Sequence, residues 1–374
     1  MNSHFYRTTR DAHSCHGIGL LLLLLALPCL GGCAVRTGSK SIPRDRFDYS
    51  SAINRSWKEQ MLLNLVRVRY LDPPMFLDVQ QVVAQYTLER SASVNATDWE
   101  GNPAVGLPAV GISGRWAESP TITFNPMTGE KFTKSLLQPI QPVNLFALVQ
   151  SGWPIDAVFG VGVRAINGLN AGSRTEMLKR SADPAFYQVM SMLKELQATD
   201  SFGLRVHQAE GESGGVVIFR AHQVEESTAA IGRQVRLLLH LNQDAQEFKL
   251  TFGATASDDR EIAMLTRSML EILAEASAGV EIPASDIEEG RVVKMGLPDP
   301  SSETGPKFVV KVHSASAKPL TNDAFTAVQY RNRWFWVDDR DLASKRGIGF
   351  LLVLFTLVES GSSAAPPVLT ISKP

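Results

Sequence analysis

One short motif places a serine where it could act as a nucleophile. Gly211, Ser213 and Gly215 fit the pattern G-x-S-x-G. In that pattern, a strained turn between a strand and a helix projects the serine oxygen toward a histidine. The segment that follows, 216–219, reads Val-Val-Ile-Phe and favours a strand over a helix. We therefore interpret the motif as the glycine-rich tip of a hairpin and assign no catalytic residue to it.

The histidines that could bind a metal ion or move a proton are scattered along the chain. After residue 33 they are His207, His222, His240 and His313, and no two lie three or four residues apart. No H-E-x-x-H motif is present, so a histidine-based zinc site is not predicted. The acidic run 338–341 lacks the glycine and the closing glutamate of a calcium loop. We expect no metal, no cofactor, and a helix-capping role for Asp341.

An aromatic segment at residues 330–336 is the strongest candidate for a binding surface. On a strand, Trp334 and Trp336 share one face while Phe335 takes the other, and Arg331 and Arg333 lie beside them. Two alternatives stay open. The tryptophans are covered by the core and a helix, or Trp334, Trp336, Arg331 and Arg333 bind a glycan or a protein partner.

The N-terminus has the pattern of a secretory signal. Residues 1–16 are polar and include Arg7 and Arg10, an apolar run covers residues 18–30, and two glycines precede Cys33. The apolar run is about 13 residues, whereas a membrane-spanning helix needs roughly 20. We predict that residues 1–32 form a signal peptide that is removed.

The four residues Leu30-Gly31-Gly32-Cys33 resemble the bacterial lipobox. The resemblance implies that the chain is a lipoprotein precursor whose Cys33 carries diacylglycerol and, after cleavage, an acyl chain such as palmitate. Ala34 stands where many lipoproteins of the inner membrane have an aspartate, which implies anchoring at the periplasmic face of the outer membrane. The inner membrane and the soluble periplasm are the alternatives. Beyond the lipobox, the body resembles uncharacterised proteobacterial lipoproteins, and this implies no mechanism.

Composition limits the remaining functions. The chain has 374 residues and a formal net charge of −1, and removal of residues 1–32 makes that charge only one unit more negative. This balance argues against a nucleic-acid partner. All three cysteines, Cys15, Cys29 and Cys33, lie in the signal or at the lipid site. The mature body therefore has no thiol for a disulfide and must be stabilised by packing, for which the chain's overall hydrophobic content of 44% is sufficient.

The first half of the mature chain is predicted to be a tether followed by a mixed subdomain. Residues 33–49 read as the lipidated cysteine and a polar tether, and residues 50–200 as a helical and β subdomain. A helix is expected from Ser50 or Ser51 to Val68, ending before the prolines at 73 and 74. Its basic residues are Arg55, Lys58, Arg67 and Arg69. They form either a solvated face or a surface that lies on anionic headgroups.

After that helix, residues 76–88 and 121–124 are predicted strands, and 91–119 a long excursion or loose hairpin. Helices are expected from Pro142, from residue 155 to 166, and from Pro184, where Asp183 precedes a proline at the first helical position.

Residues 201–374 are predicted to contain three units, each a pair of strands followed by a helix. The strand pairs are 204–207 with 216–219, 248–252 with 262–265, and 324–330 with 334–337, and the helices begin near 227, 268 and 341. Further strands are expected at 308–312 and 367–371. The order of elements predicts an α+β fold, an antiparallel or mixed sheet with helices on one face. The last helix is apolar nearly all round and is expected in the core.

These observations favour an outer-membrane lipoprotein with a structural or protein-interaction role in the cell envelope. Its expected partners are the membrane, through the lipid, and an envelope protein or glycan. The alternative is a lipid-anchored hydrolase that acts on envelope polymers, with catalytic carboxylates that the sequence does not locate.

Overall fold

The computed structural model describes residues 42–83, 86–95, 109–118, 121–173, 181–209, 212–220, 225–293, 310–320 and 322–359. Its fold is α+β, as predicted. The chain divides into a smaller unit, Met1–Ala52 with Ala84–Thr121, and a larger unit, Ile53–Val83 with Ile122–Pro374. The predicted signal peptide, Cys33, most of the tether and the predicted strand at 367–371 lie outside the described residues.

The smaller unit contains a hairpin of two long strands, β2 (Tyr86–Asn95) and β3 (Ala109–Glu118). They pair antiparallel without a shift of register, so much of the predicted excursion at 91–119 is a regular hairpin. The register sets apolar residues opposite apolar residues: Leu88 and Trp116, Ala92 and Ile112, Val94 and Val110. Alternation with a period of two in both strands accounts for this register, because a shift by one residue would pair apolar with polar positions.

Helix α2 (Ile42–Arg69) begins inside the segment predicted to be a tether. Ser50 and Ser51 are therefore interior helical residues and do not cap it. The helix ends before the two prolines, as predicted, and Leu71 adopts a left-handed φ of 60° in the turn that follows. In the larger unit, Met61, Leu62, Leu65 and Val66 bury one face of α2 in the core.

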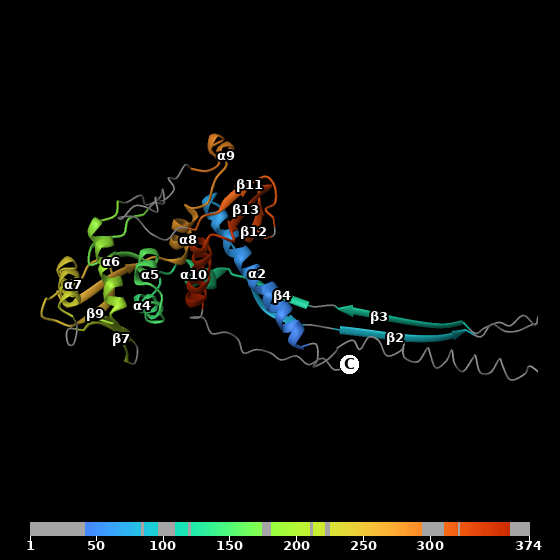
Figure 1. Cartoon of the computed structure of the whole chain (residues 1–374), viewed down its shortest axis with the longest axis horizontal. Coiled ribbons are helices and arrows are strands. Elements are labelled where there is room, and N and C mark those ends of the chain that lie inside the picture. The colour runs from blue at the N-terminus through green and yellow to red at the C-terminus, as the bar shows by residue number, and fades with distance from the viewer. Residues whose placement is uncertain are drawn as a thin grey trace, which may run out of the picture. The chain divides into compact units, whose positions relative to one another are not determined.

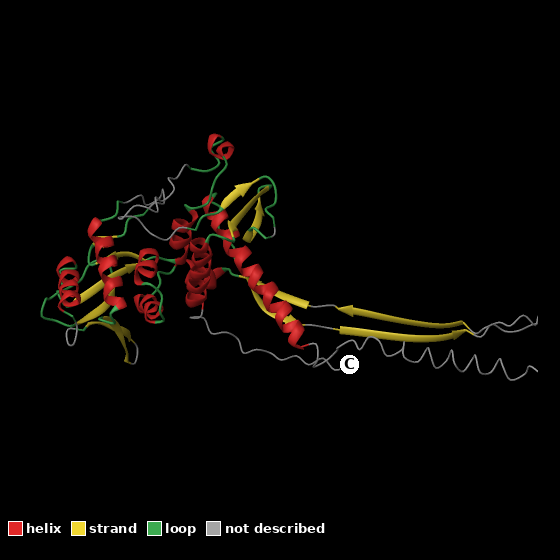
Figure 2. Ribbon diagram, viewed as in Figure 1, coloured by secondary structure: helices red, strands yellow, loops and turns green. Residues whose placement is uncertain are grey.

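A six-stranded mixed sheet forms one part of the larger unit (Figure 2). Its order is β6 (Leu169–Asn170), β5 (Val163–Ile166), β10 (Glu261–Thr266), β9 (Glu247–Phe252), β8 (Glu212–Phe219) and β7 (Phe202–Ala209). Residues 163–166, predicted to continue a helix, instead form β5. Helix α5 (Ile155–Gly162) ends first, and β-branched Val163 and Ile166 pair with β10. The sheet thus combines strands from both sides of residue 200.

The strand pairs differ from the prediction at one point. The first unit, β7 and β8, is an antiparallel hairpin followed by α7 (Glu226–Leu238), as predicted. The second pair, β9 and β10, is parallel and therefore not a hairpin. Residues 253–260 carry the chain back along the sheet, and the backbone N–H of Gly168 donates to the carbonyl of Ala254 in that connection. Strand spacing alone does not distinguish a short return loop from a hairpin turn.

Helices cover one face of this sheet in the region of β7, β8 and β9. In β9, Phe248 and Leu250 are buried while Glu247 and Lys249 are exposed. Gly215 in β8 lies on the covered face, where an added Cβ would approach Val143 of α4 (Pro142–Gln150). Figure 1 shows α4, α5, α6 (Pro184–Ala198) and α7 gathered at this sheet, with α6 packed between α5 and α7. Pro142 and Pro184 occupy the first turns of their helices, as predicted.

Arg267 ties this sheet to the helices that precede it. Its side chain is 6% exposed, and its guanidinium donates to the carbonyls of Gly160, Val161 and Gly172 at 3.2, 2.9 and 2.7 Å. Two of those carbonyls belong to the last turn of α5, where the helix dipole favours a positive charge. The next residue, Ser268, forms a capping box with Glu271 at the start of α8 (Met269–Ser277).

A three-stranded antiparallel sheet and α10 (Leu342–Glu359) form another part of the larger unit. Its order is β11 (His313–Ala315), β13 (Arg333–Asp338) and β12 (Ala324–Tyr330). The strand predicted at 308–312 lies partly outside the described residues, and Val312 makes only a single bridge, to Val280. Asp341 caps α10 as predicted, accepting hydrogen bonds from Ala343 and Ser344. Burial alone would raise the pKa of Asp341, but these hydrogen bonds lower it below its ordinary value.

The remaining described elements are short. They are β1 (Leu77–Val83), β4 (Thr121–Pro126), α3 (Gly129–Phe132), the π-helical turn η3 (Thr133–Leu137) and α9 (Ala284–Glu288). Strands β1 and β4 pair with each other. Helix α10 buries Ile348, Phe350, Leu351 and Leu354 in the core, as predicted. In the part of the chain that the structure describes, no helix is both long and apolar enough to cross a bilayer.

We expect Arg267→Lys to destabilise the larger unit by about 3 kcal/mol, because an ammonium group cannot reach carbonyls on both sides of a guanidinium and leaves buried acceptors unpaired. Chemical denaturation would measure the loss. Arg205→Lys is the matched control, because Arg205 forms only an exposed ion pair with Glu247 and its change should cost less than about 0.5 kcal/mol. Equal stability of the two variants would contradict this role for Arg267.

We also expect the larger unit to remain folded without the hairpin. The hairpin falls in the smaller unit, and the larger unit has an extensive hydrophobic core of its own residues. Replacing residues 84–119 by a short Gly-Ser turn between the paired strands β1 and β4 should shift the main thermal unfolding midpoint by less than about 4 °C, which corresponds to less than roughly 2 kcal/mol. Loss of the cooperative transition would show that the hairpin stabilises the body.

Candidate functional site

Two side-chain amides of α2 hold the neighbouring extended segment. Asn64, which is fully buried, donates to the carbonyl of Met75 at 2.8 Å and accepts from its N–H at 2.9 Å. Gln60 makes the same pair of bonds with Leu77, donating at 3.2 Å and accepting at 2.5 Å. Four residues of helix advance by about 6 Å and two residues of strand by about 6.6 Å, so the two spacings match. The two amides thus pair with the backbone N–H and C=O groups of Met75 and Leu77, as a neighbouring strand would.

Gln60, Met75 and Leu77 also line a groove in the larger unit, with a volume of about 860 Å³. One wall is α2, where Arg55, Glu59, Leu63 and Arg67 recur every four residues and so lie along one helix face. The other wall is β12, from Ala324 to Gln329 without interruption. Successive strand residues point to opposite faces, so six consecutive residues line one groove only where it follows the strand edge.

That edge of β12 is open in the described part of the chain. Strand β12 pairs with β13 on one side and stands at the end of the sheet order on the other. An unpaired edge presents backbone N–H and C=O groups that can pair with another extended chain. The groove therefore combines a hydrogen-bonding strand edge with a helical wall.

Basic residues surround the groove. Among the described residues, Arg55, Lys58, Arg67 and Lys318 line it together with one acidic residue, Glu59. None of the four makes an ion pair with a carboxylate that the structure describes. Two of them lie over aromatic rings instead, Lys58 at 4.6 Å from the ring centre of Phe325 and Lys318 at 5.1 Å from that of Trp334. The groove therefore has an uncompensated positive charge.

Its lining also contains apolar surface and one unsatisfied polar atom. Met75 and Phe124 are each 54% exposed and Leu77 is 40% exposed. Thr326 lines the groove with only 6% of its surface exposed, and its hydroxyl has no hydrogen-bond partner within the described residues. That oxygen is itself buried, so it is not available to an occupant of the groove.

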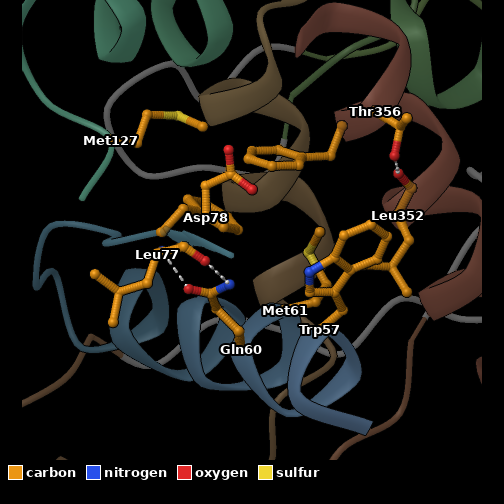
Figure 3. Close-up of a pocket in the computed structure, with 10 residues that line it drawn as sticks. Trp57, Gln60, Met61, Leu77, Asp78, Met127, Leu352 and Thr356 are labelled. Carbon is orange, nitrogen blue, oxygen red and sulfur yellow. Dashed lines mark hydrogen bonds between the residues drawn. The ribbon is translucent and has the colours of Figure 1, made fainter. Parts of the chain in front are cut away.

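Gln60 and Leu77 also line a second, smaller hollow (Figure 3). Trp57, Met61, Met127 and Leu352 line it from α2, the segment after β4 and α10, and Asp78 stands among them. Its cavity volume is about 40 Å³, room for a few water molecules and not for an organic ligand. The larger groove is therefore the better candidate for a binding site.

The four residues predicted as a binding surface lie on one hairpin but do not converge. Trp334 lines the groove. Trp336 lies 5.5 Å from the ring of His313, and Phe335 is fully buried on the opposite face, as the alternation predicted. Arg333 begins β13 and is half-buried. Of the four, the structure places only Trp334 in the groove.

Arg331 takes part in a structural network. It lies in the turn between β12 and β13 with a left-handed φ of 47°, over the rings of Tyr70 and Tyr330, and pairs with Asp72 at 3.4 Å. Tyr330 also donates to Asp72. Tyr70 donates to Asp286 at 2.6 Å, and burial, followed by this bond, raises its pKa above the ordinary value. The network fixes the hairpin turn to the end of α2.

The other residues that the sequence analysis considered for catalysis or metal binding do not form a site in the described part of the chain. Ser213 lies within strand β8, paired with Gln208, so it is neither at the hairpin tip, where we expected it, nor at a turn from strand to helix. Asp339 pairs with Lys345 and Arg340 with Asp323. His207 and His222 have no described side chain. Within the described residues, no group of three or more potential metal ligands occurs.

Sequence reasoning missed most of the groove. Arg55, Lys58 and Arg67 were recognised as basic residues of one helix, and they do line it. Arg69 does not, because it is buried and donates to the carbonyl of Val293 at 2.9 Å. The signal available in the sequence was the four-residue spacing of Arg55, Glu59, Leu63 and Arg67, which places them on one face of the helix. Nothing in the sequence brings Lys318 and Thr326 to the same place.

Comparisons with known proteins give no relative for this chain: no family model, no curated protein and no solved structure matches it.

We expect Asn64→Leu to loosen the segment that forms the groove wall. Removing the amide leaves the N–H and C=O of Met75 without their partners, at a cost of about 1–3 kcal/mol. Amide hydrogen exchange at Met75 should speed up by roughly tenfold or more. Gln60→Leu is the matched control, which should affect Leu77 instead of Met75. Unchanged amide exchange at Met75 in the Asn64 variant would contradict the conclusion that Asn64 holds this segment in place.

Proposed function

We propose that the protein is a lipoprotein, anchored through Cys33 at the periplasmic face of the outer membrane, with a protein-interaction role in the cell envelope. The single observation that carries the proposal is the sequence Leu30-Gly31-Gly32-Cys33 directly after a short apolar run. A diacylglycerol group and an added acyl chain on one residue supply the two or more chains that stable anchoring requires.

The groove along β12 supports the interaction role. It combines an open strand edge, exposed apolar side chains and uncompensated positive charge in one hollow. Such a combination is typical of surfaces that bind an extended segment of another protein. By contrast, the described lining of the groove holds one carboxylate, that of Glu59, and no histidine, so it gathers no set of residues that could carry hydrolysis.

Anchoring is tested by comparing the natural chain with Cys33→Ala after expression in a Gram-negative host. We expect the natural chain in the outer-membrane fraction, with a mature N-terminus that begins at a lipid-modified Cys33 by mass spectrometry. The Cys33→Ala variant should leave that fraction, because the acyl chains supply the membrane affinity at about 0.8 kcal/mol per buried methylene.

Cys29→Ala is the matched control, because Cys29 lies within the predicted signal and should not alter the mature protein. An unmodified mature N-terminus in the natural chain, or equal recovery of the natural chain and Cys33→Ala in the outer-membrane fraction, would overturn the proposal.

A further inference from the structure

We infer that the groove between α2 and β12 binds an acidic segment of a partner protein in extended conformation, which adds to the sheet as a strand beside β12. The inference rests on the proposed interaction role and specifies the chemistry of the partner. It depends on three properties of the groove: its hydrogen-bonding edge, its charge and its dimensions.

The edge supplies direction and register. Strand β12 has one paired side and one side that no described strand covers, and the groove follows that open side from Ala324 to Gln329. A strand laid there would pair its backbone with β12, while its alternate side chains met the helix face of α2 or the exposed apolar side chains.

The charge selects the partner. Four cations and one carboxylate line the groove, and no described carboxylate pairs with the cations. Lys58 and Lys318 lie over Phe325 and Trp334, which holds each ammonium group near the groove without neutralising it. An occupant with Glu or Asp at alternate positions would neutralise these groups, whereas a basic occupant would be repelled.

The same charge argues against a second copy of this chain. Pairing two copies through β12 would bring Arg55, Lys58 and Lys318 of both into one interface, where like charges in a low-dielectric contact are destabilising. The dimensions also suit a single added strand. The seven residues of β12 are about 23 Å long at roughly 3.3 Å each, and 860 Å³ lies in the range of pockets that enclose a ligand.

The test uses the mature, lipidated chain in detergent and three synthetic octapeptides labelled with fluorescein. The first alternates Glu and Val, the second alternates Lys and Val, and the third is the Glu-Val peptide with alternate backbone nitrogens methylated. Fluorescence anisotropy measures the Kd. We expect the first peptide to bind with a Kd of about 10–100 μM and the other two at least tenfold more weakly, because one has the wrong charge and the other lacks the edge donors.

Two variants locate the binding. Lys318→Glu, at an exposed position in the groove lining, should weaken binding of the Glu-Val peptide by about tenfold or more. Lys249→Glu is the matched control, because Lys249 is also exposed but lies on β9, away from the groove lining. Circular dichroism and thermal melts check that both variants keep the natural fold.

The alternative occupants give distinct results. Equal binding of the methylated peptide would show that charge alone attracts the ligand and would overturn strand addition. Binding of phosphatidylglycerol vesicles that depends on Lys318, without binding of any peptide, would assign the groove to lipid headgroups. If the Glu-Val peptide bound only to a chain ending at Glu359, the natural occupant of the groove would be the C-terminal segment of this chain. If the peptide bound only after dilution had dissociated a dimer seen by light scattering, the occupant would be a second copy.

The absence of binding in every arm would overturn the inference. In that case the fractionation result for Cys33→Ala still decides the anchoring separately.

Discussion

The groove exists because a helix takes the place of a strand. Gln60 and Asn64 satisfy the backbone of Met75 and Leu77 in the way that a neighbouring strand would, so the segment leading into β1 lies against α2. A strand in that place would itself offer a continuous edge, whereas α2 offers side chains. The wall opposite β12 is therefore a row of long polar and basic side chains, and the strand edge faces them without pairing.

The charges of the groove depend on the aromatic residues of the small sheet. An isolated ammonium group near apolar surface is costly unless it stays hydrated or finds a partner. Lys58 and Lys318 each lie over a ring, an arrangement worth about 0.5–1 kcal/mol where water still has access. That interaction is weak enough to be exchanged for a carboxylate. The aromatic contacts hold the ammonium groups in position while leaving their charges free for a ligand.

Local signals in the sequence predicted the starts of elements better than their partners. Pro142, Pro184, Ser268 and Asp341 each mark a helix start, because capping and proline geometry act within a few residues. Asp183 stands at the N-cap position as predicted, but its carboxylate accepts from the N–H of Asn170 and does not cap the helix. Val163–Ile166 was assigned to a helix because apolar spacing alone does not reveal pairing with β10, which lies about a hundred residues later. The parallel pairing of β9 with β10 and the groove itself depend on contacts of the same long range. The sequence therefore predicted the fold class and, of the groove, only Trp334 and the basic residues of α2, without bringing them together.

The hairpin of β12 and β13 shows why the predicted binding residues separate in the structure. Its turn is fixed to the end of α2 through Asp72, which accepts from Tyr330 and pairs with Arg331. The same attachment sets the position of β12 relative to α2. If Arg331 instead pointed into the groove to contact a ligand, the turn would lose its ion pair with Asp72. The distance between β12 and α2 would then be less well defined. Arg331 therefore positions β12, and in the proposed complex the ligand would contact Lys58, Lys318 and Trp334 instead.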